Sequence, residues 1–124
     1  MTKALPELLV PVEFAPGETR VAATPDTVKK YVTLGCKVSI ESGAGDSAGF
    51  LDEDYQSAGG HVISRSDSQV WGQADVLLVV QAPSEESFKK LKKGSLVCGL
   101  LSPYSNSVLA NALKEGGLSA ISLE

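Results

Sequence analysis

The sequence predicts an α/β fold with an open, doubly wound, mostly parallel sheet and helices on both faces, of the flavodoxin/Rossmann-like type. Short apolar runs alternate with helical patterns from end to end, which favours helices layered on a sheet over a bundle or a sandwich. Residues 76–80 are apolar throughout, as expected of a central strand covered on both faces. The 124 residues, 43% of them hydrophobic, correspond to a single α/β domain, residues 1–124.

The first third of the chain predicts two strands around one well-marked helix. Leu8–Val12 is a strand that contains a terminating proline. Thr24 is placed to cap a helix with Pro25 at its first position, and Gly35 ends that helix. Cys36–Glu41 alternates apolar and polar residues, which predicts a strand that is wet on one face and therefore lies at an edge of the sheet.

The remaining elements follow from caps and apolar spacing. Ser84 is expected to cap a helix whose four lysines, between residues 89 and 93, complement the negative end of the helix dipole before Gly94. In order, the other predictions are a helix capped by Asp52 that runs through Ala58, a strand at 61–63, a helical turn at 70–71, a strand at 76–80, a strand at 96–101, a helix at 105–116 and a strand from 118 to 123.

Composition excludes several classes of function. The net charge is −4 and the isoelectric point is near 5.0, so we expect no nucleic-acid partner. No apolar run approaches the ~18 residues of a spanning helix, so we expect a soluble chain with no direct membrane insertion. Cys36 and Cys98 lie in separate apolar runs. They are interpreted as buried thiols in a reducing cytosol.

Any binding site is expected where the parallel strands end. In doubly wound sheets, ligands lie outside the carboxyl ends of the strands, where the strand order reverses. The residues that follow the predicted strands there are 12–14, 42–43, 81–83 and 102–103. Arg20 lies close in sequence to this edge, where its guanidinium either binds a carboxylate or phosphate, or forms a salt bridge with Glu13 or Glu18.

Other motifs favour structural roles. The glycines between residues 43 and 49 resemble a dinucleotide-binding loop only superficially, because the third glycine comes one residue late and Asp46 would repel a phosphate. His61, the single histidine, has no nucleophile pattern around it, and no residues have the spacing of a metal site.

Several short segments, taken in order, resemble the alanine dehydrogenase and pyridine nucleotide transhydrogenase N-terminal domain family. The resemblance runs from about Leu8 to Glu124, and many short matches in one order are more specific than a single motif. The matching segments are Val10–Glu13, Gly17–Pro25, Leu34–Val38, Glu41–Gly45, Phe50–Tyr55, Ala58–Gly60, Val70–Trp71 and Ala74–Leu78.

Two positions distinguish the branches of that family. The alanine dehydrogenases that this sequence resembles carry a lysine where Gln81 stands and a histidine where Ser102 stands, and these groups bind and protonate a keto acid. Neither an amide nor a serine hydroxyl is a general acid near neutral pH. The resemblance therefore favours the transhydrogenase branch, in which hydride passes between NAD(H) and NADP(H).

The resemblance implies that this chain is the N-terminal subdomain of the alpha subunit of a proton-translocating NAD(P) transhydrogenase. It would form one wall of the NAD(H) hydride-transfer cleft, lined by Arg20, Gln81 and Ser102. NAD would be the cofactor of the full-length protein, held mainly on a Rossmann subdomain absent from this sequence. The isolated chain is then expected to bind no cofactor tightly and to be inactive.

The same resemblance implies the partners and the location. The partners are the rest of the alpha subunit and the membrane-embedded transhydrogenase subunits, and the place is the cytoplasm, at the cytoplasmic face of the inner membrane once assembled. A subdomain separated from its neighbours exposes apolar surface, which allows a homodimer. An alanine dehydrogenase-like oxidoreductase fragment and a free-standing flavodoxin-like binding or interaction module remain alternatives.

Overall fold

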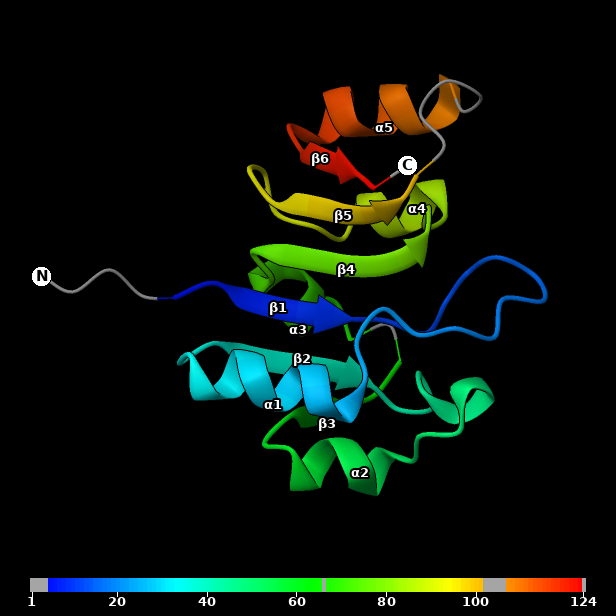
Figure 1. The fold of residues 1–124 in the computed structure, drawn as a ribbon. Helices are drawn as coiled ribbons and strands as arrows, with labels where there is room; N and C mark the ends of the chain where they lie inside the picture. Colours follow the sequence, from blue (N-terminus) through cyan, green and yellow to red (C-terminus); the bar gives the residue numbers. More distant parts are fainter. Residues whose placement is uncertain (1–4, 66, 102–106, 124) are drawn as a thin grey trace, which may run out of the picture.

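One six-stranded parallel sheet organises the chain in the computed structural model, which describes residues 5–65, 67–101 and 107–123, without the side chains of 107–109 (Figure 1). The strand order is β3-β2-β1-β4-β5-β6. This is the Rossmann order, in which the chain reverses direction across the sheet between β1 and β4. The predicted fold class is thereby confirmed, with the Rossmann order rather than the flavodoxin order.

The elements alternate along the chain as the apolar pattern predicts. The strands are β1 (Glu7–Val10), β2 (Lys37–Glu41), β3 (His61–Ile63), β4 (Val76–Gln81), β5 (Leu96–Leu100) and β6 (Ser119–Ser122). The helices are α1 (Pro25–Thr33), the 3-10 turn η1 (Asp46–Ala48), α2 (Asp52–Ser57), α3 (Ser68–Gln73), α4 (Glu85–Phe88) and α5 (Ser107–Gly116). Thr24 caps α1 and Ser84 caps α4 through their side chains, as predicted.

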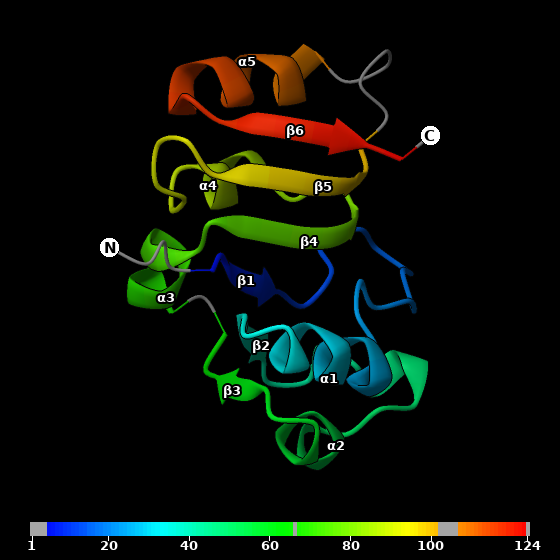
Figure 2. The same cartoon turned by 60° about the vertical axis from the view of Figure 1, so that its left-hand side comes forward.

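Two apolar cores lie on opposite faces of the sheet. Figures 1 and 2 show α1 and α2 on one side of the sheet, with α3 and α4 on the other. The α1–α2 core packs Val28 of α1 and Tyr55 of α2 against β1 and β2. The α3–α5 core packs Trp71, Phe88 and Ala112 against β1, β4 and β5. Strands β1 and β4 are the two central strands, so the prediction that residues 76–80 form the centre of the sheet is confirmed.

The prediction that the second strand lies at an edge is wrong. Strand β2 lies between β1 and β3, and its polar residues Ser39 and Glu41 are buried at 5% and 3% exposure. They lie beneath the α3–α5 side of the sheet, where Glu41 accepts hydrogen bonds from the backbone N–H of Val12 (2.9 Å) and from Nε1 of Trp71 (3.1 Å). The alternation of apolar and polar residues in β2 therefore reflects buried polar side chains, of which Glu41 is hydrogen-bonded, and the edge strand on this side of the sheet is β3.

Two predicted helices also differ from those observed. Asp52 is the first residue of α2 and not its cap, because its carboxylate turns away to accept from Ser42 Oγ (2.6 Å) and the N–H of Gly43 (2.9 Å). Helix α4 is one turn long, so the lysines at 89–93 follow it instead of ending it. Individual contacts occupy them: Lys92 pairs with Asp75 (2.7 Å) and Lys90 lies 5.4 Å from the Trp71 ring centroid.

Both cysteines are free, and both are half-buried where full burial was expected. Cys36 precedes β2 and packs against the α1–α2 core. Cys98 lies in β5, with its neighbours Val97 and Gly99 buried. Cys98 is only half-buried because alternate residues of β5 point to opposite faces of the sheet, and the buried residues Val97 and Gly99 alternate with it.

Glu41→Ala is expected to lower the free energy of unfolding by about 3 kcal/mol, because it leaves the part-buried N–H of Val12 and the buried N–H of Trp71 without this acceptor. Trp71→Phe removes one of these two donors and should cost less. Urea unfolding followed by circular dichroism measures both. Glu115→Ala, at an exposed carboxylate of α5, is the matched control and should change stability by less than about 0.5 kcal/mol. Equal losses for Glu41→Ala and the control would contradict this interpretation.

Candidate functional site

The candidate site lies at the carboxyl ends of β1 and β4, where the strand order reverses. The segment of residues 11–24 leaves β1 here and passes over this edge before α1 begins (Figure 1). It brings Glu13, Glu18 and Arg20 beside Gln81, the last residue of β4. Two of the three predicted site residues therefore lie in one cluster. Ser102, the third, lies outside the described residues.

Glu13 binds the end of β4. Its carboxylate accepts hydrogen bonds from the backbone N–H groups of Val80 (2.8 Å) and Gln81 (3.0 Å). Burial raises the pKa of Glu13, and the two backbone hydrogen bonds oppose that rise only in part. The N–H groups that a parallel strand presents at the reversal point are thus already bonded within the chain.

Glu18 joins Arg20 to Gln81. Its Oε1 accepts from Nε2 of Gln81 (2.6 Å) and from Nη2 of Arg20 (2.8 Å), and its Oε2 accepts from Nε (3.0 Å) and the backbone N–H of Arg20 (2.8 Å). These bonds, led by the one from the guanidinium, hold the pKa of Glu18 far below its usual range. Glu18 therefore stays ionised throughout the physiological range of pH.

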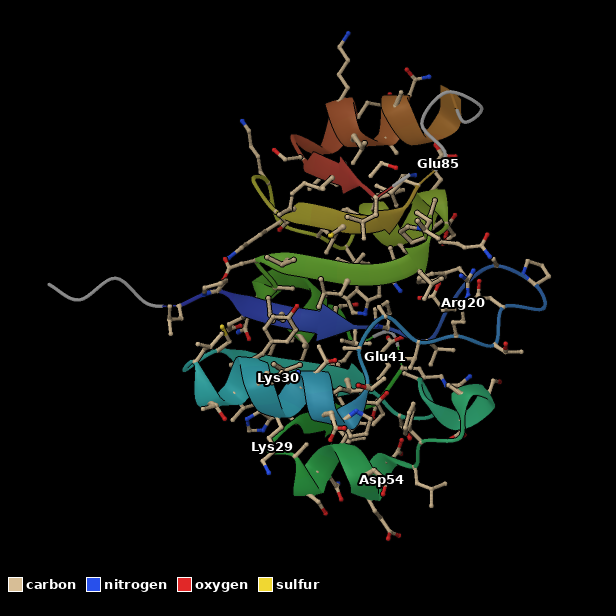
Figure 3. All side chains as sticks on the ribbon, in the orientation of Figure 1. Arg20, Lys29, Lys30, Glu41, Asp54 and Glu85 are labelled. Carbon is tan, nitrogen blue, oxygen red and sulfur yellow. The ribbon has the colours of Figure 1, made fainter. Side chains whose placement is uncertain are left out.

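Arg20 is paired and also open to solvent. Its side chain is 61% exposed, whereas that of Glu18 is 4% exposed. Of the two salt bridges that the sequence left open, the structure forms the one to Glu18. Figure 3 labels Arg20 on the segment that follows β1. An anion that binds Arg20 would have to share the guanidinium with Glu18. The cluster of Glu13, Glu18, Arg20 and Gln81 carries one net negative charge when both carboxylates are ionised, because the amide of Gln81 is neutral.

The cluster offers hydrogen bonds and charge but no obvious nucleophile. The sequence placed Glu13 at the edge where a site was expected and named Glu13 and Glu18 as possible partners of Arg20, but their contacts to β4 were missed. The signal for Glu13 was its position three residues beyond β1, at the reversal edge. The bond from Gln81 to Glu18 spans 63 residues, and no local pattern indicates it.

The glycine-rich loop is filled from within the chain. Asp52 accepts from Gly43, and this bond is the main reason why the pKa of Asp52 is lowered. Gly45 packs so closely that a Cβ there would lie 2.8 Å from the Tyr55 ring and 2.9 Å from Phe50. His61 begins β3 and is exposed. Within residues 5–65, 67–101 and 107–123, no three His, Cys, Asp or Glu side chains are grouped as metal ligands.

Comparison with known proteins gives the family. Residues 9–124 match the sequence model of the family described as "Alanine dehydrogenase/PNT, N-terminal domain". The chain belongs to this family. Among curated relatives, alanine dehydrogenase of Bacillus subtilis is 37% identical over 115 residues, which are 93% of this chain and 30% of the relative. Alanine dehydrogenase of Mycolicibacterium smegmatis is 32% identical over 93% of this chain and 31% of its own.

Solved structures from both branches of the family have the same fold. A transhydrogenase from Sinorhizobium meliloti superposes with a TM-score of 0.86 and 31% identity, over 94% of this chain and 34% of its own. An L-alanine dehydrogenase gives the same TM-score with 33% identity, over 94% of this chain and 32% of its own. The chain thus spans about a third of the length of the family members that it matches. Its membership in this family relates the chain to two kinds of oxidoreductase, the alanine dehydrogenases and the transhydrogenases.

None of the helices in the described ranges has the length and apolar character needed to cross a membrane. The longest described helix, α5, has ten residues.

Glu18→Gln is expected to destabilise the chain more at pH 7 than at pH 3. Because the pKa of Glu18 is lowered on folding, its contribution is present above its unfolded pKa of 4.5 and is progressively lost as the pH falls. Urea unfolding of the variant and the parent at both pH values measures this difference. Glu115→Gln is the control, with little change at either pH. An equal loss at pH 7 and pH 3 would show that the ion pair is not the cause.

Proposed function

We propose that the chain is the N-terminal subdomain of the alpha subunit of a proton-translocating NAD(P) transhydrogenase and forms one wall of its NAD(H) cleft. The observation that carries the proposal is the neutral side chain at the end of β4. Gln81 donates from Nε2 to Glu18 at 2.6 Å, at the position where the alanine dehydrogenases that the sequence resembles carry a lysine. An amide cannot supply the charge or the proton that a keto acid requires.

The electrostatics of the cluster support the same proposal. The one cation, Arg20, is already bonded by Glu18 through two side-chain nitrogen atoms. The charge left over is negative when Glu13 is ionised, which disfavours an anionic keto acid beside Gln81. Hydride transfer between two nicotinamide nucleotides requires no keto acid in the site.

The residues described do not fit the diphosphate of NAD. The N–H groups of Val80 and Gln81, at the edge where Rossmann sheets bind nucleotides, are bonded by the Glu13 carboxylate. The N–H of Gly43, in the glycine-rich loop, is bonded by Asp52. Under the proposal, NAD is held by parts of the protein beyond these residues, and Arg20, Gln81 and Ser102 line the facing wall.

The small matched fraction of each relative supports the proposal that the chain is part of a longer subunit. About two thirds of the Sinorhizobium meliloti transhydrogenase chain lies outside the match. We extend the proposal to the remainder of an alpha subunit and the membrane-embedded transhydrogenase subunits as partners, at the cytoplasmic face of the inner membrane. An alanine dehydrogenase-like oxidoreductase is the second candidate, favoured by the 37% identity with the Bacillus subtilis enzyme.

Activity of the protein encoded by the whole open reading frame separates these two candidates. Purified with its membrane partners, it is expected to transfer hydride from NADH to NADP⁺, measured as NADPH formed in an enzymatic end-point assay. It should not oxidise NADH when pyruvate and ammonium are supplied. Oxidation that depends on pyruvate, without NADPH formation, would reject the transhydrogenase assignment in favour of the alanine dehydrogenase one.

NADH binding tests how much of the cleft this chain supplies. Residues 1–124, checked for native secondary structure by circular dichroism, are expected to show no saturable binding in a micromolar titration followed by NADH fluorescence. The reason is that Glu13 and Asp52 already bond the N–H groups named above. Micromolar affinity of the isolated chain for NADH would overturn the proposal that this chain supplies only one wall of the cleft.

A further inference from the structure

Strand β4 carries one extra residue near its carboxyl end. Leu78 pairs with Cys98 of β5, and the next pair is Gln81 with Leu100. Strand β4 therefore advances three residues where β5 advances two, which is the one-residue excess of a β-bulge. Bulges re-aim side chains and are frequent beside functional sites. This bulge ends at Gln81, the residue of β4 that belongs to the candidate site.

The bulge decides which face of the sheet carries the side chain of Gln81. Val79 points into the α3–α5 core, so unbroken alternation would point residue 81 into that core as well. Paired residues of neighbouring strands share a face, and Leu100 alternates with Val97, which also points into that core. Gln81 therefore points to the opposite face, because a slip of one residue reverses the side chains that follow it. There its Nε2 lies 2.6 Å from Glu18 Oε1.

Glu13 supplies the hydrogen-bond acceptors at the bulge. The N–H groups of Val80 and Gln81 both donate to its carboxylate, at 2.8 and 3.0 Å. Successive N–H groups of a regular strand point to opposite sides, so one acceptor serves both only where the strand is irregular. Strand β1 pairs with β4 at Val76 and Leu77, before the bulge. The Glu13 carboxylate thus satisfies the two N–H groups that the bulge turns the same way.

Gly99 gives the bulge its room on the side of β5. A Cβ at this position would lie 2.9 Å from Cγ2 of Val79 and still closer to the Val79 carbonyl oxygen. Both residues are buried, so the surrounding core resists any displacement. Only a residue without a side chain therefore lets the backbone of β5 approach the bulge this closely.

We propose that Glu13 and Gly99 are positioning residues, which hold the β4 bulge and thereby turn Gln81 toward Glu18 in the wall of the cleft. The inference rests on the proposed function, in which Gln81 lines that cleft. Glu13 holds the bulge through hydrogen bonds and Gly99 through the space that it leaves. Both act on the site through the direction of the Gln81 side chain.

The resonance of the Gln81 side-chain amide tests the direction of this side chain without any activity. Nuclear magnetic resonance of the isotope-labelled chain of residues 1–124 detects it, and its absence from Gln81→Ala assigns it. Glu18→Ala removes the acceptor and gives the position of the unbonded amide. Glu13→Ala and Gly99→Ala are each expected to move the resonance to that position, whereas Glu13→Gln, which keeps one acceptor oxygen, should move it only part of the way.

Val38→Ala is the control for a general loss of stability. Val38 is 0% exposed and lies near the amino end of β2, away from the bulge. This variant is expected to lower the urea midpoint and to leave the Gln81 resonance in place. An unmoved resonance in folded Glu13→Gln and Gly99→Ala would overturn the inference, even if Glu13→Ala does not fold.

Hydride-transfer kinetics test the same roles in the protein encoded by the whole open reading frame, purified with its membrane partners. Gln81→Ala and Glu13→Ala are each expected to lower kcat/KM for NADH about tenfold, because both misplace the same amide. The double variant should lose no more than either single one, whereas Val38→Ala and Gln81→Ala should combine independently. Independent losses from Glu13→Ala and Gln81→Ala would overturn the inference.

The two readouts separate failure of the inference from failure of the proposed function. A parent protein that forms no NADPH would reject the proposed function, and the resonance of Gln81 would still decide whether Glu13 and Gly99 set its direction. An active parent whose Gln81 resonance is unchanged by Glu13→Gln and Gly99→Ala would reject the positioning roles alone.

Discussion

Two carboxylates hold the segment after β1 between its neighbouring strands, and the rest of the site depends on them. Glu41, at the end of β2, accepts from the N–H of Val12 at 2.9 Å. Glu13, which follows Val12 in the chain, accepts hydrogen bonds from the N–H groups of Val80 and Gln81 at the end of β4. The carboxyl ends of β2, β1 and β4 are thereby linked in order. This linkage sets the direction in which residues 14–24 leave the sheet and where Glu18 and Arg20 lie.

The same linkage changes what the reversal point of a Rossmann-ordered sheet can bind. In such sheets this edge usually offers N–H groups to a ligand, but here they are bonded to a carboxylate of the chain itself. The segment after β1 carries no glycine fingerprint and instead brings an ion pair, Glu18 with Arg20, against Gln81. This edge therefore carries an ion pair and hydrogen bonds that are already formed within the chain, and the guanidinium of Arg20 is its exposed cation.

The family comparison and the geometry answer different questions. Membership in the alanine dehydrogenase/PNT N-terminal domain family rests on residues 9–124, and members of both branches share the fold at a TM-score of 0.86. Similarity of fold therefore does not separate the branches. Under the proposed function, the identity of residue 81 distinguishes the branches, because an amide bonded to Glu18 cannot replace a titrating group. That is why the proposed function depends on the side chain of one residue.

The sequence by itself determined the fold class, the central position of residues 76–80 and the cap of α1, because each depends on local pattern. It also identified the edge at which Arg20 and Gln81 lie. Only the tertiary structure decided that β2 is internal, since the buried carboxylate of Glu41 is hydrogen-bonded to Trp71, 30 residues further along the chain. It likewise showed that Asp52 bonds the glycine-rich loop and that Glu18 pairs with Arg20. The bond between Glu18 and Gln81 joins segments with no shared periodicity, and it forms only once β1 and β4 lie side by side.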